Sequence, residues 1–296
     1  MWAWKLALAS CALIWGGSFV IIKGSLDVMP ACSLMALRFL LAALLLGAVC
    51  WRQLRDNFDW SHLLAGSILG VLAGAAYAVQ NVGLTYTTPG RSAFLTAVYC
   101  VLVPFVNWVV ARRRPGATSV LAAVLCMAGV GLISLGEDLV PSLGAGEQLT
   151  LLSALLFALQ IVFVAKFAGA HDMMTLTVIQ MAVSSAACWV FSLLLGEPAT
   201  DLSTLDASFW WSLAYMVVLA SCVCNAVQNV AQTVVPPAPA ALLLSLESVF
   251  AVVASVLFYG EQLTPRLVAG FALIFAAVLA SELGPTLVRR ALASRS

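Results

Sequence analysis

The chain has 296 residues, of which 63% are hydrophobic and 9% are charged. Soluble domains have about 45–50% apolar and about 25% charged residues, so the composition excludes an ordinary soluble protein and indicates a polytopic membrane protein. The formal net charge is +1, and nothing in this balance points to a nucleic-acid partner.

Apolar segments follow one another along the chain, each long enough to cross about 30 Å of hydrocarbon as a helix. We therefore expect an all-α membrane protein with ten transmembrane helices and no soluble domain. The expected spans are residues 5–24, 32–51, 62–85, 91–111, 118–136, 148–167, 173–195, 208–232, 238–259 and 265–284. The eight cysteines lie in or beside these runs and are expected to pack as small apolar residues. No metal site and no cofactor are predicted.

The sequence contains an internal repeat, because Ala78–Val82 reads AVQNV and the same five residues recur as Ala226–Val230. The same spacing pairs Pro89 with Pro237 and Tyr99 with Glu247. Five spans per half is an odd number, so the second half must enter the membrane from the opposite side. We predict two inverted five-helix repeats, residues 1–140 and 141–296, with a binding site near the midplane between them.

Lys and Arg are distributed unequally between the two sets of loops, and short loops rich in these residues stay in the cytoplasm. This asymmetry predicts that both termini are cytoplasmic. One set carries Lys5, Arg52, Arg55, Arg112, Arg113, Arg114, Lys166, Arg289, Arg290 and Arg295, and the other carries only Lys23, Arg91 and Arg266.

Polar side chains inside the spans are the candidate site, because such groups normally face the interior of the bundle or a water-filled cavity. The alternative is that they only form hydrogen bonds between helices. The predicted substrate-binding residues are Trp15, Ser18, Tyr77, Gln80, Asn81, Tyr99, Gln160, Asn225, Gln228, Asn229 and Glu247, and the predicted coupling or charge-bearing residues are Glu247 and Arg38.

Glu247 lies about nine residues into its span, near the bilayer centre, where an ionised carboxylate costs at least about 2–3 kcal/mol. It must be paired, hydrated or protonated. It could bind a cationic substrate group or a coupling proton, or it could pair with Arg38 or a backbone group. Arg38 could reach the cavity, or its side chain could extend outward to the membrane surface.

Two groups of glycines interrupt the spans. Gly16 and Gly17 lie in a WGGSF segment, where they could allow the helix to bend beside a cavity or allow close packing. Gly66, Gly70 and Gly74 have the small-xxx-small spacing of a helix-packing face.

Enzyme motifs such as HExxH, GxSxG and a phosphate-binding GKS or GKT are absent from the sequence, so no enzyme is predicted. Without an ATP-binding motif, transport would depend on a gradient or on facilitated diffusion.

Four segments resemble bacterial transporters of the EamA family in the drug/metabolite transporter superfamily: WGGSF, the ALRFLLAALLL context of Arg38, Gln80–Pro115 and Ser245–Thr264. Ser248 departs from the family pattern, which commonly has proline there. The resemblance implies a ten-helix inverted-repeat carrier in the bacterial cytoplasmic (inner) membrane that exports amino acids, other metabolites or toxic compounds by alternating access.

The expected function is secondary transport, as export, of a small amphiphilic metabolite such as an amino acid. The expected partners are this small-molecule substrate, the lipid bilayer and a proton or other ion for coupling. An importer, and a receptor or scaffold without transport, are the alternatives.

Overall fold

The computed structural model describes residues 2–112, 114–134 and 143–293. Within these ranges the chain is helical and contains no strand. The predicted boundary between the halves, at residues 140 and 141, lies outside them, as do the predicted cytoplasmic residues Arg113 and Arg295.

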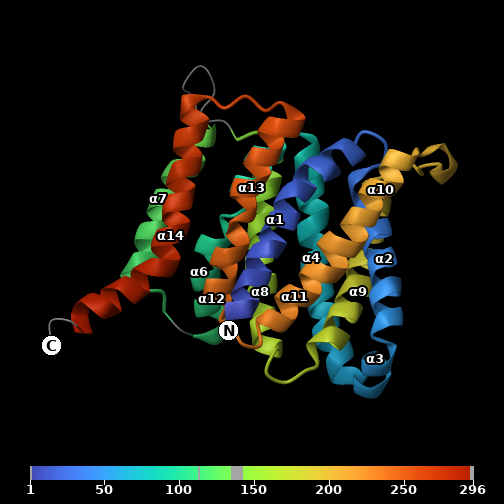
Figure 1. Ribbon diagram of the computed structural model, residues 1–296, viewed down its shortest axis with the longest axis horizontal. Helices are drawn as coiled ribbons and strands as arrows, with labels where there is room; N and C mark the ends of the chain where they lie inside the picture. The colour runs from blue at the N-terminus through green and yellow to red at the C-terminus, as the bar shows by residue number, and fades with distance from the viewer. Residues whose placement is uncertain (1, 113, 135–142, 294–296) are drawn as a thin grey trace.

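The helices form one bundle and run roughly along a common direction (Figure 1). In chain order they are α1 (Trp2–Ser25), α2 (Ala31–Val49), α3 (Trp51–Asn57), α4 (Trp60–Thr85), α5 (Pro89–Thr96), α6 (Tyr99–Ala111), α7 (Ala117–Ser134), α8 (Ala145–Phe167), α9 (Met173–Leu194), η1 (Leu202–Thr204), α10 (Ala207–Tyr215), η2 (Met216–Val223), α11 (Cys224–Ala231), α12 (Pro237–Ser245), α13 (Glu247–Ala254), η3 (Ser255–Tyr259) and α14 (Pro265–Ala293).

Among the described residues, eight helical stretches are long and apolar enough to cross a membrane. They are Trp2–Ser25, Ala31–Val49, Trp60–Thr85, Pro89–Val110, Ala145–Phe167, Met173–Leu194, Ala207–Ala231 and Pro237–Tyr259. The two other predicted spans correspond to shorter apolar helices, Val120–Ile133 within α7 and Pro265–Ala280 within α14. The chain is therefore an all-helical membrane protein.

Helix starts follow from the local sequence. Asp59, Thr88, Asp172 and Asp206 accept hydrogen bonds from the backbone N–H groups of the first turns of α4, α5, α9 and α10. Such caps satisfy donors that the helix itself leaves free. Pro89 stands in the first turn of α5, where a missing N–H has no cost.

Two spans are irregular at matching positions. The span that begins at Pro89 breaks between α5 and α6, and the span that begins at Pro237 breaks between α12 and α13. Tyr99 and Glu247, paired by the repeat spacing, each begin the second helix of their span. At the break, Val98 donates to Leu95 O at 3.3 Å, a tight i to i+3 turn. Both halves therefore place an irregular helix segment at the same point of the repeat.

The helices of the earlier part of the chain, α1 to α7, interleave with those of the later part, α8 to α14. The central helix α4 packs against α8 and α9, α2 packs against α9 and η2, and α1 packs against α11, α12 and α13. The pair α7 and α14 lies together at one side of the bundle (Figure 1). Helix α3 marks one end of the bundle, here called the α3 end, where α1 starts and α14 finishes (Figure 1). Helix α10 lies at the opposite end, here called the α10 end (Figure 1).

Glycines permit the closest helix contacts. A Cβ added at Gly66, Gly70 or Gly74 would lie 2.5–2.9 Å from atoms of α9, so the small-xxx-small face of α4 packs against α9 as predicted. A Cβ at Gly16 would lie 2.6 Å from Phe250 Cβ and 2.7 Å from Glu247 O. Because α1 continues unbroken through this residue, Gly16 permits packing against α13 and does not end a helix segment.

The α4–α9 contact generates a stability prediction. Gly70→Ala places a Cβ 2.5 Å from Val183 Cβ and 2.8 Å from the Gln180 carbonyl oxygen, and overpacking of this kind costs about 1–3 kcal/mol. The measurement is thermal unfolding in detergent. The matched control is Gly24→Ala in α1, where a Cβ meets nothing within 4 Å and stability should be retained. Equal melting temperatures for Gly70→Ala and the wild type would contradict the assigned packing.

Candidate functional site

A cavity lies in the centre of the bundle, between helices contributed by both parts of the chain. Its volume is about 50 Å³, which holds a few water molecules. Every predicted site residue except Asn229 contributes to its wall. The predicted lining residues are Trp15, Ser18, Arg38, Tyr77, Gln80, Asn81, Tyr99, Gln160, Asn225, Gln228 and Glu247.

The remaining lining residues are mostly apolar and were not predicted: Phe19, Ile22, Ala73, Leu84, Thr96, Phe157, Ile161 and Leu244. Apolar side chains in a membrane span carry no signal that separates cavity from lipid. The helical period could have found several of them, because residues three and four apart share one face. Ala73 and Leu84 lie on the face of Tyr77 and Gln80, and Phe157 lies on the face of Gln160.

The repeated amide pair is used differently in the two halves. Gln80 Nε2 donates to Thr96 Oγ1 at 2.9 Å, and Gln228 Nε2 donates to Gln160 Oε1 at 3.3 Å. Both glutamines thus face the cavity through equivalent positions. Asn81 Nδ2 donates to Tyr77 O at 2.7 Å, and its Oδ1 is buried without a hydrogen-bond partner.

Asn229 was predicted to line the cavity, but it is not among the lining residues. Its Nδ2 donates to Thr177 Oγ1 and to Gln180 Oε1, both at 2.9 Å, so the side chain belongs to the contact between α11 and α9. A single helical step of about 100° separates it from Gln228, and this rotation turns it away from the cavity.

Several lining groups are already hydrogen-bonded within the protein. Trp15 Nε1 donates to Ala220 O at 2.7 Å, and Ser18 Oγ donates to Trp15 O at 2.6 Å. Asn225 Nδ2 donates to Ser221 O at 3.0 Å. Ala220 and Ser221 belong to η2, a π-helical segment, and such wide turns are common at functional sites. These side chains shape the wall and leave few donors free for a ligand.

Arg38 is completely buried, with 0% of its surface exposed, so the outward-extending alternative is wrong. Its Nε donates to Ser221 Oγ at 2.7 Å. Its Cζ lies 5.3 Å from the ring centroids of both Phe39 and Tyr77, a distance at which aromatic faces stabilise a cation. Nη2 has no hydrogen-bond partner.

Glu247 is also buried, with 7% of its surface exposed, and its carboxyl group interacts with the Tyr99 hydroxyl. The repeat spacing relates these two residues, so equivalent positions of the two halves contact each other. No ion pair joins Glu247 to Arg38 in the described part of the chain, and the alternative of a structural pair between them is therefore wrong.

Hydrogen bonds connect the two parts of the chain at the α10 end. Glu261 accepts from Thr88 Oγ1, from Ser255 Oγ and from Gly90 N at 3.0 Å. Glu197 accepts from Cys32 N at 2.9 Å and from Ser33 N at 2.8 Å, at the start of α2. Each carboxylate therefore joins a loop of the later part to a helix start of the earlier part.

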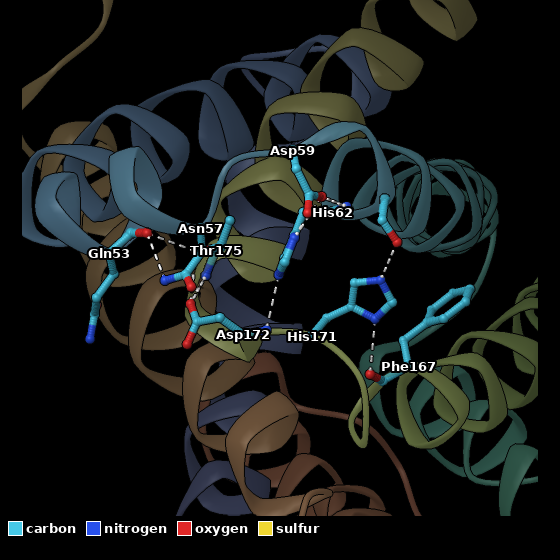
Figure 2. Close-up of polar contacts among 9 residues, drawn as sticks. Gln53, Asn57, Asp59, His62, Phe167, His171, Asp172 and Thr175 are labelled. Carbon is cyan, nitrogen blue, oxygen red and sulfur yellow. Dashed lines mark hydrogen bonds and ion pairs between the residues drawn. The ribbon is translucent and has the colours of Figure 1, made fainter.

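A second set of contacts connects the two parts at the α3 end, where Figure 2 shows the two histidines between the start of α4 and the loop from α8 to α9. His62 Nε2 accepts from Asp172 N at 3.1 Å, while His62 Nδ1 lies 2.8 Å from Asp59 Oδ1. His171 Nε2 lies 2.8 Å from Ser61 Oγ. Both ends of the bundle are thus joined by polar contacts, with the cavity between them.

This architecture is that of a polytopic membrane protein with a central cavity that polar and apolar side chains line together, and comparison with known proteins defines its class. The sequence profile of the EamA-like transporter family matches residues 2–135 and 144–282. The chain belongs to this family of membrane transporters.

Two similar proteins are described as uncharacterized transporters. One, from Archaeoglobus fulgidus, is 29% identical over 274 residues, covering 93% of this chain and 84% of the relative. Another, YvbV from Bacillus subtilis, is 27% identical over 281 residues, covering 92% and 89%. A solved crystal structure shares the fold with a TM-score of 0.70 and 16% identity, covering 97% of this chain and 98% of that chain.

Glu197 generates a prediction on pH dependence. Burial alone would raise the pKa of Glu197, but hydrogen bonds from Cys32 and Ser33 hold this pKa below its usual value of 4.5. A carboxyl group whose pKa is lower in the folded state than in the unfolded state stabilises the fold above the unfolded-state pKa. This stabilisation is lost as the pH falls through the folded-state pKa. Glu197→Gln should therefore be less stable than the wild type at pH 7, by less than about 1 kcal/mol because the carboxylate is only partly buried and solvent screens its charge.

The measurement is unfolding of both proteins between pH 7 and pH 3. The two stability curves should approach each other as the pH falls below about 4.5 and converge below the lower folded-state pKa of Glu197, because the wild-type carboxylate becomes neutral there like the amide. A stability difference that stays constant down to pH 3 would contradict the assigned role of the ionised group.

Proposed function

We propose that the protein is a secondary transporter that exports a small organic metabolite, such as an amino acid or a related amphiphilic compound. The observation that carries this proposal is the central cavity, whose wall combines aromatic rings, amides, one arginine and one glutamate from both parts of the chain. Such a mixture suits an amphiphilic solute, because polar groups fix its orientation while apolar groups cover the rest. No catalytic role is proposed.

An inverted repeat supplies the mechanism. We propose ten membrane crossings in two five-helix repeats, residues 1–140 and 141–296, related by an axis in the membrane plane. The matching helix breaks at Tyr99 and Glu247 support this arrangement, as does the family match to two successive stretches. In such folds one repeat rocks against the other around a central site.

The size of the cavity requires movement. Pockets that bind drug-sized ligands have volumes of about 300–1,000 Å³, well above the 50 Å³ found here. A metabolite therefore enters only when the contacts at one end separate. We propose that the Glu197 and Glu261 contacts at the α10 end open in alternation with the His62 and His171 contacts at the α3 end.

Glu247 is the proposed coupling group. Its carboxyl group can exchange a proton or accept a cationic substrate group inside the cavity, and the sequence contains no ATP-binding motif that would drive transport instead. Export is the proposed direction because it is the direction that the family resemblance implies. Vesicles of known orientation distinguish export from import of the same solute, because the two directions give net flux of opposite sign.

The proposed location is a bacterial cytoplasmic membrane with the α3 end and both termini in the cytoplasm. Helix α3 and the ends of α6 and α8 lie at the α3 end (Figure 1). They carry Arg52, Arg55, Arg112 and Lys166, and short basic loops stay in the cytoplasm.

Cysteine labelling tests this orientation. All eight native cysteines are buried, so they should react little with an impermeant maleimide. In intact cells the reagent should label Leu202→Cys, whose side chain is at the α10 end, and should spare Arg55→Cys in α3. Permeabilised cells are the control, in which both positions should react. Labelling of Arg55→Cys in intact cells would reverse the proposed topology.

Glu247→Gln tests the coupling role. The amide keeps the size of the side chain and removes the charge, so the melting temperature should stay close to that of the wild type. Flux into proteoliposomes should fall about tenfold or more, because a charge-assisted contact is worth about 1.5–3 kcal/mol. The matched control is Asp201→Asn, the same chemical change at an exposed site of η1, which should transport normally. Normal flux with unchanged pH dependence in Glu247→Gln would remove this residue from the mechanism.

A further inference from the structure

The cavity wall contains a cationic side chain that the protein itself leaves incompletely paired. Arg38 is entirely buried, and it lines the cavity. A guanidinium group has five N–H donors and cannot lose its charge. The acceptors that it meets are Ser221 Oγ at Nε and the weak acceptor Met35 Sδ, 3.8 Å from Nη1. Nη2 remains without an acceptor.

The surroundings stabilise the positive charge without supplying an anion. The rings of Phe39 and Tyr77 lie against the guanidinium group, each centroid 5.3 Å from Cζ. Aromatic faces attract a cation but accept no strong hydrogen bond. No ion pair to Arg38 is found in the described residues. The site thus holds a fixed cation whose fork of donors matches a carboxylate.

The same cavity contains an acid that is not paired with this base. Glu247 lines the wall from α13, whereas Arg38 comes from α2. Tyr77 lines the same cavity, and its ring centroid lies 5.3 Å from Arg38 Cζ. The acidic and the basic group therefore belong to one site, although no ion pair joins them among the described residues. A buried charge without a counter-charge is unfavourable, and a ligand with both charges would satisfy both groups at once.

We propose that the cavity is a two-charge site for a zwitterion with a carboxylate and an amine, in which Arg38 binds the carboxylate and Glu247 binds the ammonium group. This inference rests on the proposed transport function and assigns the residues that bind each end of the solute. The apolar wall of Phe19, Ile22 and Phe157 covers the uncharged part of the ligand. The unpaired donor on Arg38 is explained by this assignment, because an intramolecular acceptor at Nη2 would compete with the substrate.

Calorimetric titration of the purified full-length protein in detergent tests the assignment. The probes are the twenty protein amino acids and, for the tightest binder, its decarboxylated amine and its deaminated acid. The wild type should bind the zwitterion at least about tenfold more tightly than either single-charge analogue. Binding of none of the twenty, or equal binding of the three related probes, would overturn the proposal.

Substitutions at Arg38 and Glu247 test the two subsites one at a time. Arg38→Met should bind the zwitterion and the amine equally, because the carboxylate subsite is gone. Glu247→Gln should bind the zwitterion and the acid equally. Arg38→Lys keeps the charge but not the fork of donors, and it should recover part of the preference for the zwitterion. An Arg38→Met protein that still prefers the zwitterion over the amine would contradict the carboxylate role.

Melting temperatures without ligand distinguish this role from a structural one. Removing an unpaired buried cation should leave the melting temperature of Arg38→Met equal to or higher than that of the wild type. A guanidinium that only holds helices together would instead lower it in both Arg38→Met and Arg38→Lys, and that result would overturn the proposal.

Flux through proteoliposomes separates failure of this inference from failure of the transport function. If the zwitterion crosses equally well through the wild type and Arg38→Met, the transporter stands and the two-charge site is wrong. If the zwitterion binds as described but no solute crosses, the site stands and the transport function is wrong.

Discussion

The structure depends on one constraint, which is that the interior of a membrane bundle offers buried polar groups very little water. A buried polar group must therefore find a partner inside the protein or retain its unfavourable energy. Most polar side chains of the cavity wall satisfy this rule locally, as Trp15 and Asn225 do with carbonyl groups of the irregular segment η2. Arg38 satisfies it only in part, because its Nη2 has no hydrogen-bond partner. Arg38 lines the cavity, where an anionic group of a solute would satisfy this donor.

The packing of the helices brings these groups together. Glycines let α4 approach α9 and let α1 approach α13, and α13 begins at Glu247 itself. Ser248 Oγ donates to Ser245 O at 2.7 Å, and a hydroxyl that bonds back in this way often bends a helix. This contact spans the break before Glu247. At both ends the contacts that join the two parts are hydrogen bonds, which can separate in water with little net cost.

Much of this site could be predicted from the sequence, because polar residues are rare in membrane spans and each has a physical reason to face inward. The AVQNV repeat identified Gln80 and Gln228 as equivalent wall residues. It did not distinguish Asn229, since one helical step turns this residue toward α9. Arg38 could not be placed from its distance to the span end, because its depth depends on Ser221 and Tyr77, which are distant in sequence. Apolar wall residues such as Ile22 could be found only through a polar neighbour, because Ile22 lies one helical turn after Ser18 on the same face.

The central claim is that the two ends of the bundle open in alternation around one cavity. Distances between spin labels test it most directly, with one pair at exposed residues of the α10 end, Val28 and Leu263, and another at the α3 end, Phe58 and Val234. Measured in liposomes, each pair should show a shorter and a longer distance. Addition of a transported solute should shift the two pairs in opposite directions. Unchanged distances, or lengthening of both pairs together, would contradict alternating access.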